Sequence, residues 1–344
     1  MRLRTVSLGL VGALAVGSAA VAADRPLDPA SASREAVRVL GPCSRPNPDA
    51  PPGPCGTPPV IGGCQVLPAD NPWNTDISAY PVHPMSSTFM STIDANGTGQ
   101  MGTIGGPNLW PSFGVQYGIP WSIVGPNQAK VPIDYFILPD ESDPGPFPIP
   151  LDAPIESGNG DNHVVTLQSG TCQVYELLGA NPDGRGGWRA ASGATFDLNS
   201  NTWRPIGFIS ADDAGTQIFA GLLKAHEVRE GRVNHAVRFT VKRAQAAFIL
   251  PARHPADSLN PNDPPFGTRF RIKAGYDISW MTGEARVIAE GLKRYGMIIA
   301  DEGPNWMIVG DRDPGWAGTN LPQLWQVPSS AFEAVYTGET TRLP

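Results

Sequence analysis

One histidine and one carboxylate interrupt the apolar rows of the segment DNHVVTLQSGTCQVYELLGA, residues 161–180. If its SG dipeptide forms a two-residue turn between two strands, His163 lies directly opposite Glu176. A carboxyl group beside an imidazole and an apolar wall has a shifted pKa and can act as an acid or a base. A three-residue turn would instead place His163 opposite Leu177. An ion pair that only fixes the strand register is the structural alternative.

A second carboxylate and a second histidine are candidates for the same site. Asp212 lies in ISADDAGTQ, where a predicted strand meets a predicted helix. Capping explains one aspartate there, and we expect Asp212 to act as base or nucleophile opposite Glu176. His235 lies on the apolar face of a strand predicted over 233–241, where a hydrogen-bonded core histidine is the structural alternative. The two histidines with Glu176 would suit a divalent metal, but their spacing requires none, and we predict no cofactor.

The stretch TRFRIKAGY alternates basic and apolar residues, which places Arg269, Arg271 and Lys273 on one face of a predicted strand. A solvated sheet face explains this pattern, whereas a groove lined by it would suit an anionic glycan such as a uronic acid polymer. The four residues KAGY resemble a strand motif of jelly-roll alginate lyases, and the resemblance implies that Tyr276 takes the tyrosine position. Arg271, Lys273 and Tyr276 are therefore the candidate substrate-binding residues.

Short strands separated by turns must position these residues. The chain holds 39 glycines and 37 prolines, and apolar runs such as HVVTLQ, CQVYELL and MIIAD are bounded by turn residues, a pattern typical of all-β domains. Two stretches predict helices: 212–231 with an aspartate N-cap, and 282–296 with Thr282 as N-cap and Gly296 as the stop. We predict a mainly β fold, a jelly-roll-like β-sandwich with a few packed helices.

Three segments are predicted along the chain. Residues 1–23 combine Arg2 and Arg4 with an apolar run and small residues, the pattern of a secretory signal peptide. Residues 24–62 are rich in proline and predict a semi-rigid extended linker. Residues 63–344 then form a single β-sandwich domain, a length that all-β folds permit. We expect the protein to be secreted or periplasmic.

Charge and hydropathy limit the partners of the chain. The net charge of −7 becomes −9 when the two arginines of the signal peptide are removed, so phosphate backbones are repelled and we expect no nucleic-acid partner. Beyond the signal peptide no segment approaches the ~18 consecutive apolar residues of a membrane helix, which predicts no membrane span. The nine tryptophans can stack on sugars, although tryptophans usually pack in the core first.

Four cysteines are present, and in an oxidising compartment an even number predicts two disulfide bonds. Three pairings are open. We favour Cys43 with Cys55, which closes a small proline-rich loop, and Cys64 with Cys172, which ties the start of the domain to the hairpin that carries Glu176. Free buried thiols are the alternative.

A series of motifs resembles a family of exported bacterial proteins. The motifs include DNPWNTDIS, HVVTLQSGTCQVYELLGA, LPARH and LKRYGMIIADEGPNWMIVG, and the resemblance covers most of residues 64–335. The family is widespread and largely uncharacterised. The resemblance implies an exported β-sandwich protein and brings no catalytic residue with it.

These residues predict a secreted enzyme that cleaves glycosidic bonds of a polysaccharide. Glu176 is expected to be the general acid, Asp212 the base or nucleophile, and His163 the residue that tunes Glu176, with His235 in the same cleft. A non-catalytic glycan-binding or cell-surface interaction protein is one alternative. A lyase acting on an anionic polysaccharide, with Tyr276 or Tyr295 and a histidine as base and acid, is another.

Overall fold

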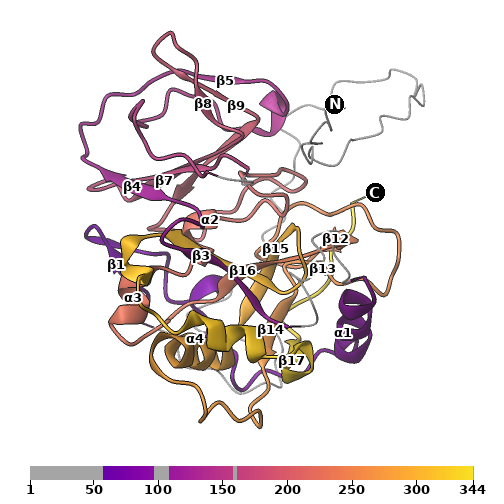
Figure 1. Cartoon of the computed structure of the whole chain (residues 1–344). Helices are drawn as coiled ribbons and strands as arrows, with labels where there is room; N and C mark the ends of the chain where they lie inside the picture. Colours follow the sequence, from indigo (N-terminus) through magenta and orange to yellow (C-terminus); the bar gives the residue numbers. More distant parts are fainter. Residues whose placement is uncertain (1–56, 97–107, 158–160, 344) are drawn as a thin grey trace, which may run out of the picture. The chain divides into compact units, whose positions relative to one another are not determined.

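The structure, a computed structural model, describes three stretches of the chain: residues 57–96, 108–157 and 161–343 (Figure 1). The predicted signal peptide, most of the predicted linker, and both Cys43 and Cys55 lie outside these stretches. Among the described residues, none of the helices has the length and apolar character needed to cross a membrane.

A six-stranded mixed sheet is the largest sheet of the described residues, with the order β17-β14-β15-β11-β16-β3 (Figure 1). In that order its strands span Phe332–Val335, Arg269–Ile272, Met297–Glu302, Val237–Val241, Met307–Arg312 and Trp110–Gly114. β11 pairs in parallel with β15 and antiparallel with β16. Every residue of β11 is buried, as is typical of β-branched and aromatic residues in the interior of a sheet.

The remaining strands form smaller sheets. A four-stranded sheet has the order β10-β7-β6-β4, with the bounds Ser192–Asp197, Gln173–Leu178, Val164–Gln168 and Trp121–Val124. A three-stranded sheet has the order β5-β9-β8, with the bounds Ile133–Tyr135, Trp188–Ala190 and Asn181–Pro182. Two further pairs are β1 with β2 and β12 with β13, with the bounds Val60–Ile61, Cys64–Gln65, Gln245–Phe248 and Pro265–Phe266.

One apolar core joins the six-stranded sheet to the four-stranded sheet. Val165 and Val174 of the smaller sheet pack in one cluster with Ile298 and Val309 of the larger sheet. The mainly β prediction is therefore confirmed. The predicted jelly-roll arrangement is not confirmed, and the parallel pairs β11–β15 and β16–β3 differ from the antiparallel pairing of jelly rolls.

The helix predicted over 282–296 is confirmed as α4, which spans Gly283–Arg294. Thr282 occupies the N-cap position, and Gly296 takes the left-handed backbone conformation, with φ +67°, that favours glycine after a helix. The buried face of α4 belongs to the second large apolar core and consists of Ala285, Ile288, Ala289 and Leu292. These residues recur at the three- and four-residue spacing of an amphipathic helix.

The single helix predicted over 212–231 is wrong, because this stretch contains two short helices. They are α2 at Ile218–Gly221 and α3 at Ala225–Arg229. Between them the backbone N–H of Leu223 donates to the carbonyl of Val309 on β16, 3.2 Å away. This bond to the sheet holds the connecting residues extended and interrupts the helix. The sequence analysis did not identify α1 at Ser86–Ala95.

The predicted register of the hairpin formed by β6 and β7 is also wrong. Val165 pairs with Glu176, and Gln168 pairs with Gln173, so four residues rather than two join the strands. The additional residues move the partner of every position by two. A shift of two keeps each side chain on its predicted face but separates His163 from Glu176.

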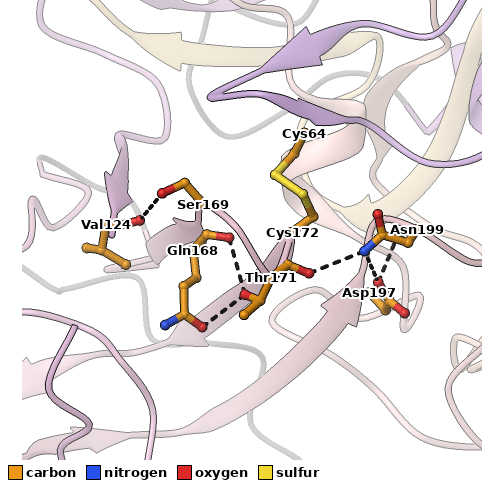
Figure 2. The surroundings of a disulfide bond; sticks show 8 residues. All are labelled: Cys64, Val124, Gln168, Ser169, Thr171, Cys172, Asp197 and Asn199. Carbon is orange, nitrogen blue, oxygen red and sulfur yellow. Dashed lines mark hydrogen bonds between the residues drawn. A yellow bond between two sulfur atoms is a disulfide. The ribbon is translucent and has the colours of Figure 1, made fainter. Parts of the chain in front are cut away.

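The disulfide bond between Cys64 and Cys172 is confirmed and lies in this four-residue connection (Figure 2). Cys172 adopts a left-handed backbone conformation with φ +56°, and its N–H donates to the carbonyl of Gln168. The Thr171 hydroxyl donates to the side chain of Gln168, and Ser169 donates to the carbonyl of Val124 (Figure 2). These contacts, together with the bond to Cys64, favour the longer turn.

Removal of the disulfide bond should destabilise the domain without changing its fold. The bond links residues 108 apart in sequence, so the double variant Cys64→Ala/Cys172→Ala gains a large amount of unfolded-state entropy. We expect the free energy of unfolding to fall by about 2–4 kcal/mol in urea denaturation monitored by tryptophan fluorescence. Ser87→Ala on the surface of α1 is the control, and equal urea midpoints for both proteins would contradict the prediction.

Candidate functional site

Arg238 is a buried arginine on β11, on the face opposite Val237 and Phe239. Its side chain is 3 % exposed, and one terminal nitrogen lies 3.4 Å from Oδ2 of Asp301 and 3.6 Å from Oδ2 of Asp212. Its Nε is buried without a hydrogen-bond partner among the described residues. Arg238 therefore provides a buried positive charge around which carboxyl groups can gather.

The carboxyl groups of Asp213 and Asp301 lie close enough to shift each other's pKa, and Asp301 also faces Arg238. Two neighbouring carboxylates repel each other, which favours protonation of one of them. Burial, and then the charge of Asp213, raise the pKa of Asp301 well above its usual value, despite the nearby Arg238. Asp213 is exposed at the surface, but the protein atoms around its carboxyl group still raise its pKa. Of the two groups, Asp301 is the one whose pKa is raised well above its usual value.

His254 lies on the other side of Asp213. Its Nδ1 is 2.9 Å from the backbone carbonyl of Asp213, which can only accept, so Nδ1 carries a proton. Asp213, Asp301 and His254 therefore lie together near the solvent-accessible surface.

Two exposed carboxylates lie near this pair. The charge of Asp161 raises the pKa of both Asp213 and Asp301 after the larger effect of burial, and Asp257 adds to the shift of Asp213. The exposed side of the site is therefore acidic, because these carboxyl groups reach the surface whereas Arg238 is buried beneath it. Such a potential favours neutral or cationic substrates over anionic ones.

Asp212, predicted as base or nucleophile, is buried and shapes the loop that carries Asp213. Its carboxylate accepts from the N–H and the hydroxyl of Thr216, at 2.9 and 2.7 Å, and from the hydroxyl of Ser210. It is 1 % exposed, and burial raises its pKa although Arg238 lowers it. Asp212 is thus a positioning residue in this structure.

His163 pairs with Glu156 rather than with Glu176. Its Nδ1 lies 2.6 Å from Glu156, and its Nε2 lies 2.9 Å from the carbonyl of Ala211. Because both partners are acceptors, both ring nitrogens donate, and the ring is an imidazolium. Burial lowers the pKa of His163, but the effect of the facing Glu156 is larger and opposite, so the net shift of the pKa is upward.

Glu176, predicted as the general acid, is fully buried and holds the start of α2. Its two carboxyl oxygens accept from the backbone N–H groups of Ile218 and Phe219, at 3.0 and 2.8 Å. Burial raises the pKa of Glu176 to about 7, although these two bonds lower it. With no exposed surface, this carboxyl group cannot contact a substrate in the structure.

His235 belongs to a second buried ion pair. Its Nε2 lies 2.9 Å from Glu227 of α3, and its Nδ1 lies 2.7 Å from the carbonyl of Ala236. It does not share a cleft with His163, whose partner is Glu156. In the described part of the chain, no group of three His, Cys, Asp or Glu side chains is placed to hold a metal ion.

The predicted basic stripe is mostly buried rather than solvated. Arg269 donates to the carbonyls of Tyr295, Pro72 and Thr75, and Arg271 pairs with Glu333. Lys273 is exposed and donates to the carbonyl of Ser330.

The two tyrosines considered as lyase bases occupy different environments. Tyr295 is 1 % exposed, which closes it off from a polymer. Tyr276 is partly buried, and this burial raises its pKa. Neither tyrosine is among the groups whose charges shift the pKa of Asp213 or Asp301.

Comparisons of the chain with protein-family models, curated proteins and solved structures found no match. The chemistry of the site therefore rests on its own residues.

The sequence analysis missed His254, Asp301 and the role of Arg238, and it did not choose Asp213 as a site residue. Asp301 ends the predicted strand MIIAD, where a carboxylate follows four apolar residues. Arg238 interrupts a buried strand in the same way. A charged residue within a buried strand was the available signal.

The Glu156–His163 pair should stabilise the protein most in mildly acidic solution. The raised pKa of His163 means that its contribution is complete below pH 6.5 and is lost as the pH rises through the folded value. The pKa of Glu156 is lowered because His163 outweighs the opposing effect of burial, so its contribution is complete above pH 4.5 and is lost as the pH falls further.

Glu156→Gln should therefore lower the free energy of unfolding by about 3 kcal/mol near pH 5.5 and by less near pH 9. Urea denaturation across this pH range measures the difference. The control is Glu230→Gln, which removes the exposed pair with Arg232 and should cost less than about 1 kcal/mol. A loss that does not change with pH would contradict the assignment.

Proposed function

We propose that this protein is an exported enzyme that cleaves glycosidic bonds of a polysaccharide, with Asp301 as general acid and Asp161 as base or nucleophile. The observation that carries the proposal is the proximity of Asp301 and the exposed Asp213, two carboxyl groups with raised pKa values, to the buried Arg238. Glycoside hydrolysis requires one protonated and one ionised carboxyl group. The proposal places them on a fold with two packed sheets, as in a β-sandwich.

The roles follow from protonation and exposure. Asp301 holds the proton and acts as general acid toward the leaving oxygen, while Asp213 and Arg238 hold it in place. The two carboxyl groups of such an enzyme act on opposite sides of the bond, about 5–9.5 Å apart, and we assign the second role to a carboxylate other than Asp213. Asp161, which is exposed and influences both members of the pair, takes the role of base or nucleophile.

A polar cavity near the pair supports a glycan substrate. It has a volume of about 530 Å³, and Arg243 is one of its lining residues. Hydroxyl and amide groups line the rest of its polar surface, and they belong to Ser87, Thr88, Ser91, Thr92, Asn96, Asn260 and Asn262. Arg243 is fixed by two bonds to Asp263. The backbone N–H of Ala244, the residue after Arg243, donates to the side chain of Glu302 at 2.9 Å, and Glu302 directly follows Asp301 on β15. Hydroxyl and amide groups match the hydroxyl groups of neutral sugars.

The secreted location and the glycan substrate rest on separate supports. The Cys64–Cys172 disulfide bond supports an oxidising compartment such as the periplasm or the extracellular space. The acidic surface around Asp213 favours a neutral or amino-sugar polymer over the uronic acid polymer that a lyase would cleave.

Asp301→Asn and Asp161→Asn should each lower the rate of glycan cleavage by about 10²–10⁴-fold. The assay incubates the full chain with a panel of neutral, amino-sugar and uronic acid glycans and determines product masses, in which an added water marks hydrolysis. The control is Asp134→Asn, an exposed aspartate of β5, which should retain full activity. Unsaturated products, or binding without cleavage, would replace the proposal with a lyase or a binding protein.

The same assay should show a bell-shaped dependence on pH. The descending limb reports the loss of the proton from Asp301, whose raised pKa keeps it protonated well above the usual aspartate range. In Asp213→Asn the repulsion from Asp213 is absent, so the descending limb should move to lower pH by about one unit. An unchanged descending limb in this variant would remove Asp301 from the mechanism.

Asn at position 301 should also stabilise the protein above pH 7. The wild-type pKa is raised, so the favourable contribution of Asp301 is present below pH 3.8 and is lost as the pH rises through the folded value. Asp301→Asn removes this loss while keeping a donor toward Asp213. Urea denaturation near pH 8 should show a gain of about 1 kcal/mol together with the loss of activity, whereas a loss of stability would identify Asp301 as a structural residue.

A further inference from the structure

A second cavity lies at the other end of the six-stranded sheet and has a volume of about 400 Å³. We call it the basic cavity. Three of its lining side chains are cationic and one is acidic, and its lining consists of Asp76, Ser78, Arg271, Ile272, Ala274, Lys293 and Arg294. The chain as a whole carries a net charge of −7, so this excess of cations is local.

The only carboxylate of the lining is already satisfied. Oδ1 of Asp76 accepts from the N–H and the hydroxyl of Ser78, at 2.9 and 2.6 Å. Its Oδ2 accepts from Nε of Arg294, at 2.6 Å. Although burial opposes the shift, these bonds lower the pKa of Asp76, so it stays ionised and anchors the arginine.

The cations are held in place by carbonyl and carboxylate groups, and Lys293 and Arg294 retain donors. Nζ of Lys293 donates to the carbonyls of Ala274 and Tyr276, at 2.9 and 2.6 Å, and an ammonium group has three donors. Arg294 is half exposed and uses its Nε for Asp76, while a guanidinium group has five donors. Arg271 is nearly buried and is fixed by Glu333 and by the carbonyls of Ile77 and Ser78.

The basic cavity is separate from the carboxyl pair. Arg269 of β14 pairs with Ile298 near the start of β15, and Arg271 lies beyond that start. Asp301 is three residues further along β15 than Ile298, so Arg271 and Asp301 are roughly 15 Å apart along the strands. The two sites therefore present opposite charge at opposite ends of one sheet.

We propose that the basic cavity binds a small organic anion, a carboxylated or sulfated sugar. Two partly exposed cations on adjacent residues of α4 bind the acidic group, because charge-assisted hydrogen bonds to carboxylate or sulfate are about twice as strong as neutral ones. The hydroxyl of Ser78 and the backbone around Ala274 contact the ring. This binding does not depend on the catalytic proposal.

Calorimetric titration of the full chain tests the proposal, with galacturonate, galactose and galactose 6-sulfate as probes at constant ionic strength. Galacturonate or the sulfated sugar should bind with a Kd of about 1 mM or below, and galactose should not bind measurably. The stronger of the two acidic probes identifies the group that the cavity prefers. Equal binding of galactose and both acidic sugars, or no binding at all, would overturn the proposal.

Variants of α4 locate the binding. Arg294→Gln should weaken binding of the acidic sugar by about ten-fold or more, and Arg294→Lys, which keeps the charge, should weaken this binding less. The control is Arg286→Gln, which removes the same charge from an exposed pair with Glu290 on the same helix. If Arg294→Gln does not fold, Lys293→Gln serves in its place. An equal loss in the Arg286 variant would show general charge attraction and refute the site.

Discussion

The arrangement of this protein depends on the buried positive charge of Arg238 and on the carboxyl groups that surround it. Arg238 lies on a strand that is covered on both faces, and its charge acts on Asp212, Asp301, Glu176 and Glu156. A charge in this position is stable only with carboxylate partners, and removing one partner of a buried pair costs about 3–5 kcal/mol. The need of Arg238 for carboxylate partners brings together the loop before α2, the end of β15 and the hairpin of the four-stranded sheet.

Burial divides these carboxyl groups into two kinds. Glu176 and Asp212 have all their oxygen atoms occupied by backbone and hydroxyl donors, and they position α2 and the loop of Asp213. Asp213 reaches the surface, where its carboxyl group meets that of Asp301. The first kind maintains the structure and the second has the access to solvent that acid and base chemistry needs. The buried side of Arg238 is closely packed, because a Cβ added to Gly221 would lie within 2.9 Å of Arg238 and Trp73.

The two imidazole–carboxylate pairs have a comparable structural role. His163 with Glu156, and His235 with Glu227, each join segments that a register or a helix alone would not fix. In both rings the two nitrogen atoms face oxygen atoms, so hydrogen bonds hold each ring on both sides. At these two positions on apolar faces, hydrogen bonds of a histidine ring therefore take the place of apolar contacts in the core.

Local patterns in the sequence determined the mainly β class, helix α4, strand β15 and the faces of β6 and β7, because alternation and capping depend on near neighbours. The even number of cysteines predicted disulfide bonds but left three pairings open, and the tertiary structure selected Cys64 with Cys172. Only the tertiary structure decided the partner of His163, since the turn between β6 and β7 has four residues rather than two and the register is moved by two. It likewise divided the helix predicted over 212–231, where Leu223 bonds to β16. Asp213, Asp301 and His254 lie far apart in sequence, and their meeting depends on strand pairing and on the charge of Arg238, which no local pattern contains.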